Sequence, residues 1–345
     1  MVYKNIMKKN IERKVYFNGE FVNESEAKIS IYDSALMFGD MVFEMTRSFN
    51  GKQWKLRRHL ERLYSGIKIL RIPMPISIDE MEKAVLETIE INKPLFEKDD
   101  EHRVMIDVSR GLLSLYHGIP NIHKGTNVII ADFPLKWTVQ NCSHLYDSGI
   151  NLHVTSQRAI PSQLMEPKIK NRSRLFYLMA NIEASMVKGE DVWALLLDVN
   201  GYIAEGTGSN FFMVKNNKIY TPRGKDILRG ITMETIVTEI APSLGIEVIE
   251  KDIEPFDVYE SDECFITSTP FCVLPCVTLN KLKIGNGKPG KITNSLLEKW
   301  GKKVKVNIVD QIKKWDKKIL NEGSTTPYKF STKKNNSMTM EISED

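Results

Sequence analysis

The chain has 345 residues, 42% hydrophobic and 27% charged, so it can build a sizeable core and is long enough for two domains. Its 48 basic and 44 acidic residues leave a net charge of +4 and are interleaved, which argues against a nucleic-acid partner. No apolar run approaches the roughly 18 residues that cross a bilayer, and four cysteines without metal-ligand spacing favour a reduced, cytoplasmic protein that holds no metal.

The first half of the chain has the pattern of a small α/β domain, residues 15–133, behind a polar N-terminal tail, residues 1–14. Apolar residues recur at helical spacing over 57–70, and Ser77 is placed to cap a second helix. Asn18-Gly19 is a strong signal for a hairpin turn. The strands expected here are 15–17, 29–31, 42–47, 103–108 and 128–131.

Residues 134–150 show no periodicity and are expected to connect this domain to a larger one, residues 151–315. Residues 316–345 are polar, with few large apolar side chains, and are expected to be disordered. The expected helices of the larger domain are 175–187, 232–244, 292–300 and 304–315, and its expected strands are 152–157, 194–198, 211–214, 219–221, 247–249 and 263–267. The predicted fold class is α+β with two domains.

A carboxylate stands at an unusual place in the larger domain. Glu205 begins the run Glu205-Gly206-Thr207-Gly208-Ser209-Asn210, between the apolar segments 193–197 and 211–214. A charge beside two apolar strands is costly unless something binds it. The simpler interpretation is a hairpin with its Gly and Asn at the tip, so other residues must decide between the two.

Four more features could belong to the same site, although each has a simpler interpretation. Lys170 directly precedes a predicted helix and is typical of a solvated charge. Arg62 lies on the helix 57–70 and is either a surface residue or an anion ligand. Gly230-Ile231-Thr232 opens a helix, where backbone N–H groups could bind a phosphate or the threonine could simply cap the helix. Thr267-Ser268-Thr269 ends a strand, where ligand loops commonly lie.

Seven stretches, in order and at compatible spacings, resemble the class IV aminotransferases of fold type IV over roughly residues 15–315. They are Phe38–Glu44, His59–Leu63, Lys170 with Glu183-Ala184, Asp198–Gly206, Leu228–Thr232, Thr267–Thr269 and Ile284–Thr293. The family includes branched-chain-amino-acid aminotransferases, D-amino-acid aminotransferases, (R)-selective amine transaminases and aminodeoxychorismate lyase. Its cofactor, pyridoxal phosphate, requires an amine for its aldehyde, a carboxylate for its pyridine nitrogen and cationic or N–H groups for its phosphate.

The resemblance implies a homodimer whose protomer has a small N-terminal α/β domain and a larger C-terminal domain with a mixed sheet or pseudo-barrel and helices. Lys170, rather than the neighbouring Lys168, would form the Schiff base with pyridoxal phosphate and shuttle a proton at the substrate α carbon. Glu205 would pair with the pyridine nitrogen, and Leu228 would pack on the ring. The phosphate would be held by Arg62, by the backbone amides of Ile231 and Thr232, and by Thr269.

On the substrate side the chain departs from the family. Pro270 replaces a small residue whose backbone N–H holds the substrate carboxylate in branched-chain enzymes, and proline has no N–H. Phe271 adds bulk beside it. Where the D-amino-acid enzymes have an arginine and a histidine, this chain has Leu115 and His117, so only the histidine is kept.

Other residues could take over the carboxylate. Arg103 or Arg110 could bind the substrate carboxylate from a different position in the fold, and each is equally typical of a surface or structural charge. Leu175 stands where branched-chain enzymes have a tyrosine near the cofactor. Phe38 and Phe43, in the first matching stretch, are further candidates for substrate contact.

The leading functional prediction is an aminotransferase that moves an amino group from an apolar, branched-chain-like donor to a 2-oxo acid by a ping-pong mechanism. An (R)-amine or D-amino-acid transaminase is the second prediction, which Pro270 favours and Leu115 partly opposes. A lyase of the aminodeoxychorismate type and a catalytically inactive binding protein are the remaining alternatives.

Overall fold

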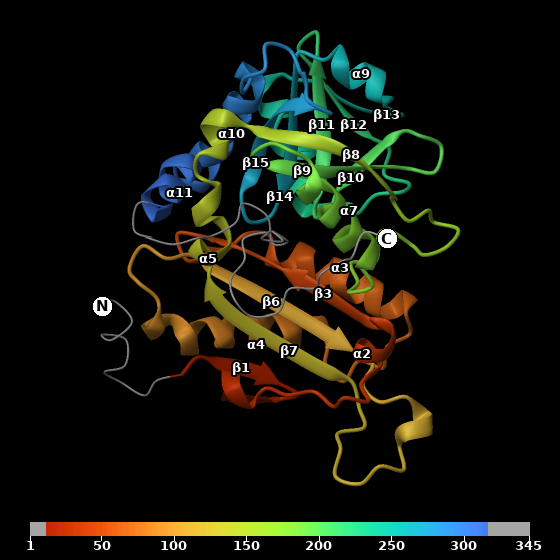
Figure 1. The fold of residues 1–345 in the computed structure, drawn as a ribbon. Coiled ribbons are helices and arrows are strands. Elements are labelled where there is room, and N and C mark those ends of the chain that lie inside the picture. The colour runs from red at the N-terminus through yellow and green to blue at the C-terminus, as the bar shows by residue number, and fades with distance from the viewer. Residues whose placement is uncertain (1–11, 317–345) are drawn as a thin grey trace, which may run out of the picture.

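The computed structural model describes residues 12–316, which fold into a lower N-terminal part and an upper C-terminal part (Figure 1). The predicted tails, 1–14 and 316–345, lie almost entirely outside the described residues. Within the described part, the first strand already begins at Lys14. No helix within residues 12–316 has the length and apolarity needed to cross a membrane.

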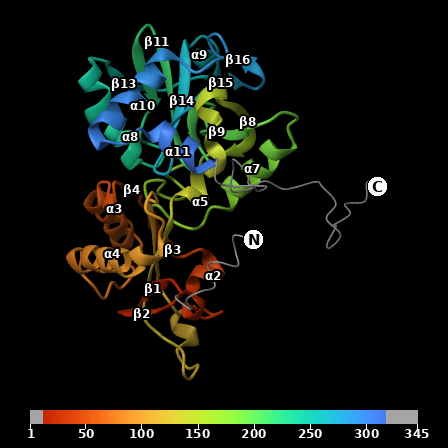
Figure 2. The ribbon, with the colours of Figure 1, turned by 90° about the vertical axis from the view of Figure 1, so that its left-hand side faces the viewer.

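The N-terminal part is a five-stranded sheet in the order β2-β1-β7-β6-β3, in which every pairing is antiparallel. Its strands are β1 (Lys14–Phe17), β2 (Glu20–Asn23), β3 (Met41–Met45), β6 (His102–Ser109) and β7 (Asn127–Pro134). Figure 2 shows the two long helices, α3 (Leu56–Ile69) and α4 (Ile78–Asn92), together on one side of this sheet. Ser77 caps α4 as predicted, by accepting a hydrogen bond from the Glu80 N–H.

Alternation along the strands divides the sheet into two faces. Val104, Ile106 and Val108 of β6 pack with α3 and α4 in the smaller hydrophobic core. The residues that alternate with them, Arg103, Met105 and Asp107, therefore belong to the opposite face, which is free of these helices.

One predicted strand of this part is wrong. Residues 29–31 form a loop before the short helix α2 (Ser34–Phe38). Ile31 is 74% exposed, so the apolar alternation there has no face to bury. Asp33 instead fixes the chain, because its buried carboxylate caps α2 and accepts hydrogen bonds from Ser109 and Asn127.

Six strands close into a ring in the C-terminal part, in the order β10-β9-β8-β15-β14-β11, with β11 returning to β10. They are β8 (Ile150–Arg158), β9 (Val192–Leu197), β10 (Ile203–Gly206), β11 (Ser209–Lys215), β14 (Glu263–Ser268) and β15 (Cys272–Leu279). Two further strands, β12 (Lys218–Pro222) and β13 (Val248–Lys251), extend the sheet from β11. This is the mixed, barrel-like sheet that the resemblance predicts.

Helices surround the ring. α7 (Leu175–Met186) packs on β8 and β9, and α10 (Lys291–Val304) and α11 (Ile308–Asp316) follow near the end of the described chain. The predicted helix 232–244 begins as α8 (Ile231–Thr235), continues with π and 3-10 turns, and ends before Gly245, as expected.

The segment expected to be a plain connection, residues 134–150, contains the short helices α5 (Lys136–Val139) and α6 (Leu145–Ser148). Its buried side chains, Leu135, Val139, Cys142, Leu145 and Tyr146, join the core of the C-terminal part. Their three- and four-residue spacing is a helical signal that the sequence-based prediction missed.

Candidate active site

The hairpin of β10 and β11 buries a carboxylate. Glu205 pairs with Asn210 across the hairpin, whose tip is Thr207-Gly208, so the hairpin is confirmed, but Asn210 lies on β11 and not at the tip. Glu205 is nevertheless only 5% exposed. Its carboxylate accepts hydrogen bonds from the Tyr177 hydroxyl, from the Leu228 backbone N–H at 3.1 Å and from Asn210 Nδ2 at 3.5 Å.

These donors are neutral, and no side chain in the described part of the chain forms an ion pair with Glu205. Burial raises the pKa of Glu205 to about 7, against the opposing effect of the Tyr177 hydrogen bond. A buried carboxylate in this state gains from any cationic group that enters the pocket, so the site fits a protonated ring nitrogen.

Lys170 reaches the same pocket from the segment before α7. Its backbone carbonyl accepts a hydrogen bond from the Phe43 N–H at 2.9 Å, which ties this segment to β3. Its Nζ lies 4.6 Å from the centroid of the Phe43 ring. Burial, and then the nearby Arg62, lower the pKa of Lys170 to about 7, so a large fraction of this amine is neutral at physiological pH.

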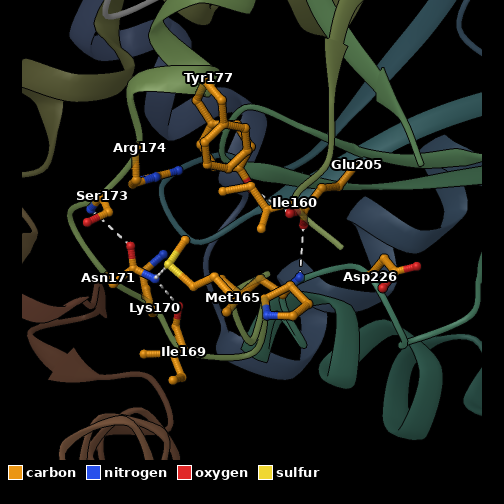
Figure 3. A pocket seen from close by; sticks show the side chains of 13 residues that line it. Ile160, Met165, Ile169, Lys170, Asn171, Ser173, Arg174, Tyr177, Glu205 and Asp226 are labelled. Atoms are coloured by element: carbon orange, nitrogen blue, oxygen red, sulfur yellow. Dashed lines mark hydrogen bonds between the residues drawn. The ribbon is translucent and has the colours of Figure 1, made fainter. Parts of the chain in front are cut away.

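Figure 3 shows Lys170 and Arg174 on one side of the pocket and Glu205 on another, with Tyr177 between them. The lining also includes Leu228. Lys168, the competing lysine, does not line this pocket; its Nζ pairs with Glu166 at 2.8 Å and donates to the Lys225 carbonyl. The geometry therefore favours Lys170 as the reactive amine.

Arg62 is held by the buried carboxylate of Glu44, which also contacts the buried His59. Its Nε and Nη2 donate to the two carboxylate oxygens of Glu44, at 2.6 and 2.9 Å, and His59 Nδ1 lies 2.8 Å from Glu44 Oε2. Glu44, on β3, is fully buried, and His59, on α3, is nearly so. Burial opposes ionisation of Glu44, but Arg62 and His59 outweigh it and hold the pKa of this carboxyl below its usual range.

Glu44→Gln is expected to lower the free energy of unfolding by about 3–5 kcal/mol, because it leaves Arg62 without its buried counter-charge. Because the pKa of Glu44 is lowered in the folded protein, its ionised carboxylate stabilises the fold at any pH above the ordinary pKa of a glutamate. This stabilisation is lost as the pH falls through the pKa of Glu44 in the folded protein. Urea unfolding at pH 7 measures the change. Glu61→Gln is the control, because Glu61 lies on the same helix as Arg62 and forms a solvent-exposed ion pair with Arg58. Equal losses of unfolding free energy in the two variants would contradict the prediction.

Arg62 also joins α3 to the start of α8, since its Nη1 donates to the Arg229 carbonyl at 2.7 Å. Gly230, between Arg229 and α8, must be a glycine because a Cβ atom there would lie 2.1 Å from Asn210 Oδ1. Asn210 in turn donates to the Leu228 carbonyl at 2.8 Å. Arg62, Ile231 and Thr232 are thus brought beside the strand that pairs with Glu205.

Thr269 lies in the turn between β14 and β15. The neighbouring Ser268 donates from Oγ to the Gly208 carbonyl at 2.8 Å, which holds this turn against the tip of the Glu205 hairpin. The remaining predicted phosphate ligand is therefore placed next to the same hairpin.

The predicted substrate residues are dispersed. Phe43 is buried under Lys170, whereas Phe38 is 66% exposed at the end of α2. His117 lies in the loop after β6, which extends away from the C-terminal part (Figure 1), and its Nε2 is 3.2 Å from the Leu112 carbonyl. The structure does not bring His117 to the pocket of its own chain.

The other predicted substrate residues differ in the hydrogen bonds that they already form within the protein. Arg110 donates to both oxygens of Asp40 and to the carbonyls at the end of α3, so its guanidinium is already engaged. Pro270 and Phe271 are buried, and their carbonyls accept hydrogen bonds from Arg47 and Tyr146. Arg103 is buried too, but without such partners.

Two pocket residues were not identified from the sequence. Tyr177, two residues after Leu175, supplies the hydroxyl bound to Glu205. Arg174 donates to the Thr207 carbonyl at 3.0 Å, and its guanidinium carbon lies 4.6 Å from the Tyr177 ring centroid. Only the fold reveals these contacts, because the residues come from separate elements.

Comparison with known proteins agrees with this geometry. Residues 41–279 match the family model described as amino-transferase class IV. A Methanocaldococcus jannaschii protein, named provisionally as a branched-chain-amino-acid aminotransferase, is 36% identical over 84% of this chain and 99% of its own length. The branched-chain-amino-acid aminotransferase of Escherichia coli K12 is 31% identical over 82% of this chain and 90% of its own.

Solved structures extend the likeness to the cofactor. A T.th. branched-chain amino acid aminotransferase complexed with N-(5'-phosphopyridoxyl)-L-glutamate matches with a TM-score of 0.73 at 27% identity, over 90% of this chain and 98% of that one. Its fold is the two-part arrangement described above, and the buried carboxylate and the amine of low pKa fit the same cofactor. The chain belongs to the class IV aminotransferases, in the branched-chain-amino-acid aminotransferase family, and is a pyridoxal-phosphate-dependent transaminase.

Proposed function

We propose that Lys170 binds the aldehyde of pyridoxal phosphate and that Glu205 pairs with its pyridine nitrogen. One observation carries this proposal: the two side chains line one pocket, and each has its pKa displaced to about 7. A neutral amine is the form that attacks an aldehyde, and a desolvated carboxylate gains most from a protonated nitrogen.

For the phosphate we propose Arg62, the N–H groups of Ile231 and Thr232, and Thr269, with Leu228 as an apolar wall for the ring. Arg62 supports this because its bonds to Glu44 and Arg229 leave some of its five N–H donors unused. We expect pyridoxal, which lacks the phosphate, to bind the apoenzyme more weakly than pyridoxal phosphate by at least about 100-fold. Equal affinities in a spectroscopic titration would contradict these assignments.

When bound, pyridoxal phosphate supplies an electron sink for the electrons left when the substrate α proton is removed. Lys170 Nζ is the base that takes this proton, because a pKa of about 7 keeps the amine largely neutral. Glu205 keeps the positive charge on the ring at the far side of the pocket. Phe43, packed beside Lys170 Nζ, limits the access of water to the amine.

The substrates we propose are an apolar, branched-chain-like L-amino acid as donor and a 2-oxo acid as acceptor. The named relatives support this choice, as does the apolar character of Phe43, Met45 and Met105 on the sheet face beside Lys170. Pro270 keeps an (R)-amine or D-amino-acid transaminase as the second candidate, since this residue cannot donate a backbone N–H.

A half-reaction screen tests the substrate proposal. L-Leucine, L-valine and L-isoleucine are expected to convert the holoenzyme to its aminated form at least about 100-fold faster than D-leucine or an (R)-amine, because a stereospecific site holds only one enantiomer with its α proton toward Lys170. Stopped-flow absorbance measures each rate. Faster conversion by the D-amino acid or by the amine would favour the second candidate.

We infer that two copies of the chain associate, because large apolar residues are exposed near the pocket. Leu36, Phe38 and Leu175 are each more than 60% exposed, and the Phe38 carbonyl accepts a hydrogen bond from Ser173 in the segment that follows Lys170. Sedimentation should give twice the chain mass of 39.6 kDa; a monomer at micromolar concentration would oppose this. A cytoplasmic location remains our proposal, in keeping with the small number of cysteines, all four of which are buried.

A further inference from the structure

Basic residues on one face of α3 bind the segment that forms the start of α8. Arg58 and Arg62 are four positions apart, so their side chains leave α3 on the same side. Arg62 Nη1 donates to the Arg229 carbonyl, just before α8. Arg58 donates from Nε and Nη2 to the two carboxylate oxygens of Glu234, at 3.2 and 2.9 Å. The N–H groups proposed to bind the phosphate lie between these two contacts, within residues 230–233, and Figure 2 shows α8 above α3.

Lys55 adds a second contact with the same segment. Its Nζ forms an ion pair with Glu239 and lies 3.8 Å from Glu234. Glu239 is also bound by Lys303 of α10 at 2.9 Å, and the side chains of Lys55 and Glu239 are only 17% and 28% exposed. An isolated surface ion pair contributes little, whereas partly buried pairs that share a carboxylate are less screened and contribute more. Lys55 and Arg58 of the N-terminal part, with Glu234 and Glu239 of the C-terminal part, are called the junction cluster below.

The backbone is unusual on both sides of the junction cluster. Lys55 has a φ of 50°, in the left-handed region that is unfavourable for a residue with a Cβ atom. On the other side, Glu239 lies on the π turn Ile236–Ile240. Side chains five positions apart point about 140° away from each other in a regular α-helix. The π turn bonds residues five apart, so Glu234 and Glu239 can contact the same lysine. Such departures from regular backbone are frequent at functional sites.

We propose that the junction cluster positions the binding site for the cofactor phosphate: Lys55 and Arg58 hold the start of α8 against Arg62, so that both parts of the chain can bind one phosphate. α3 packs in the core of the N-terminal part and α8 in the core of the C-terminal part. Contacts between them therefore decide how the two sets of phosphate ligands lie relative to each other. This rests on the proposed function, in which Arg62 and the N–H groups of Ile231 and Thr232 bind the phosphate. It makes Lys55 a positioning residue that acts through α8.

Titration of the apoenzyme with pyridoxal phosphate and with pyridoxal tests this role. Lys55→Met is expected to weaken pyridoxal phosphate by roughly 3- to 10-fold and to change the affinity for pyridoxal by less than about twofold, because only the phosphate ligands are displaced. Glu239→Gln should cause a similar loss, and the double variant should lose little more than either single variant, since both break one contact. Lys314→Met is the matched control. Lys314 also forms an ion pair across the two parts, with Asp99, but at α11 and outside the pocket that Lys170 lines, so its variant should bind both ligands like the wild type.

The variant Lys55→Gly separates this role from folding. It removes the ion pairs but also relieves the left-handed backbone, so the melting temperature of the apoenzyme should stay close to that of the wild type. Its affinity for pyridoxal phosphate should nevertheless fall as in Lys55→Met. Lys55→Arg, which keeps the positive charge, should retain most of the affinity.

A Lys55→Met enzyme that binds pyridoxal phosphate like the wild type, or that loses affinity for both ligands equally, would overturn the proposal. An equal loss in Lys314→Met would do the same. A wild type that binds pyridoxal as tightly as pyridoxal phosphate would refute the phosphate site of the proposed function. A wild type that prefers pyridoxal phosphate, together with unaffected Lys55 variants, would refute only the role of the junction cluster.

Discussion

Lys170→Ala is expected to reduce transamination by at least about 10⁴-fold, because the variant loses both the covalent attachment of the cofactor and the base at the α carbon. The pocket itself should remain: Glu205, Arg62 and the start of α8 are held by contacts that do not involve the Lys170 side chain. The variant should therefore still bind pyridoxal phosphate, but without a bond to the protein.

Borohydride reduction followed by peptide mass spectrometry separates these effects. The wild type should carry the mass of the reduced cofactor on the peptide that contains Lys170, and Lys170→Ala should carry none. Lys168→Ala is the matched control, because Lys168 is engaged with Glu166 outside the pocket and its variant should label normally. Labelling of Lys168, or a labelled Lys170→Ala protein, would refute the assignment.

The same lysine gives a pH dependence. Because burial and Arg62 lower the pKa of Lys170 to about 7, its neutral fraction should rise through pH 7 and level off above about pH 8, whereas an ordinary lysine would not reach half neutral until about pH 10.4. The rate at which the apoenzyme captures pyridoxal phosphate should follow this curve.

The sequence predicts much of the site because its key residues lie at the ends of strongly patterned elements. Lys170 precedes α7, Thr232 lies at the start of α8, and Glu205 lies at a Gly-containing hairpin. Each pattern is local, so it can be found without the fold. The choice between a solvated charge and a ligand in each case depends on burial, which a single sequence does not report.

Contacts between distant segments could not be predicted. Arg62 and Glu44 are 18 residues apart, and Arg47 reaches Pro270 across 223 residues. The Arg103 position is the clearest case, because one arginine on a strand is compatible with both a structural and a binding role. That its Nε and Nη1 have no hydrogen-bond partner within residues 12–316 becomes visible only when both sheet faces and their neighbours are known.

Glu205→Gln is expected to lower the rate of transamination by about 10²- to 10³-fold, because the amide cannot hold a positive charge on the pyridine nitrogen as a carboxylate does. Attachment of the cofactor through Lys170 should survive, so the protein should still label after borohydride reduction. Steady-state kinetics measures the loss, and Tyr177→Phe is the control that removes a hydrogen bond to the same carboxylate without removing its charge. A Glu205→Gln enzyme as fast as Tyr177→Phe would refute the ring-nitrogen assignment.

Stability should move in the opposite direction from activity in this variant. The folded pKa of Glu205 is raised to about 7 from an ordinary 4.5, so ionisation of this buried carboxyl opposes folding of the apoenzyme once the pH exceeds 4.5. The penalty grows up to about pH 7 and then stays constant, at up to about 3 kcal/mol by the usual conversion of pKa shifts. Glu205→Gln should therefore make the apo protein more stable at pH 8 and leave it little changed at pH 4, whereas Glu44→Gln destabilises it. We expect a buried carboxylate to be retained at a cost to stability when the protein needs it to bind a ligand. A Glu205→Gln protein less stable than the wild type at pH 8 would show that the carboxylate stabilises the fold instead.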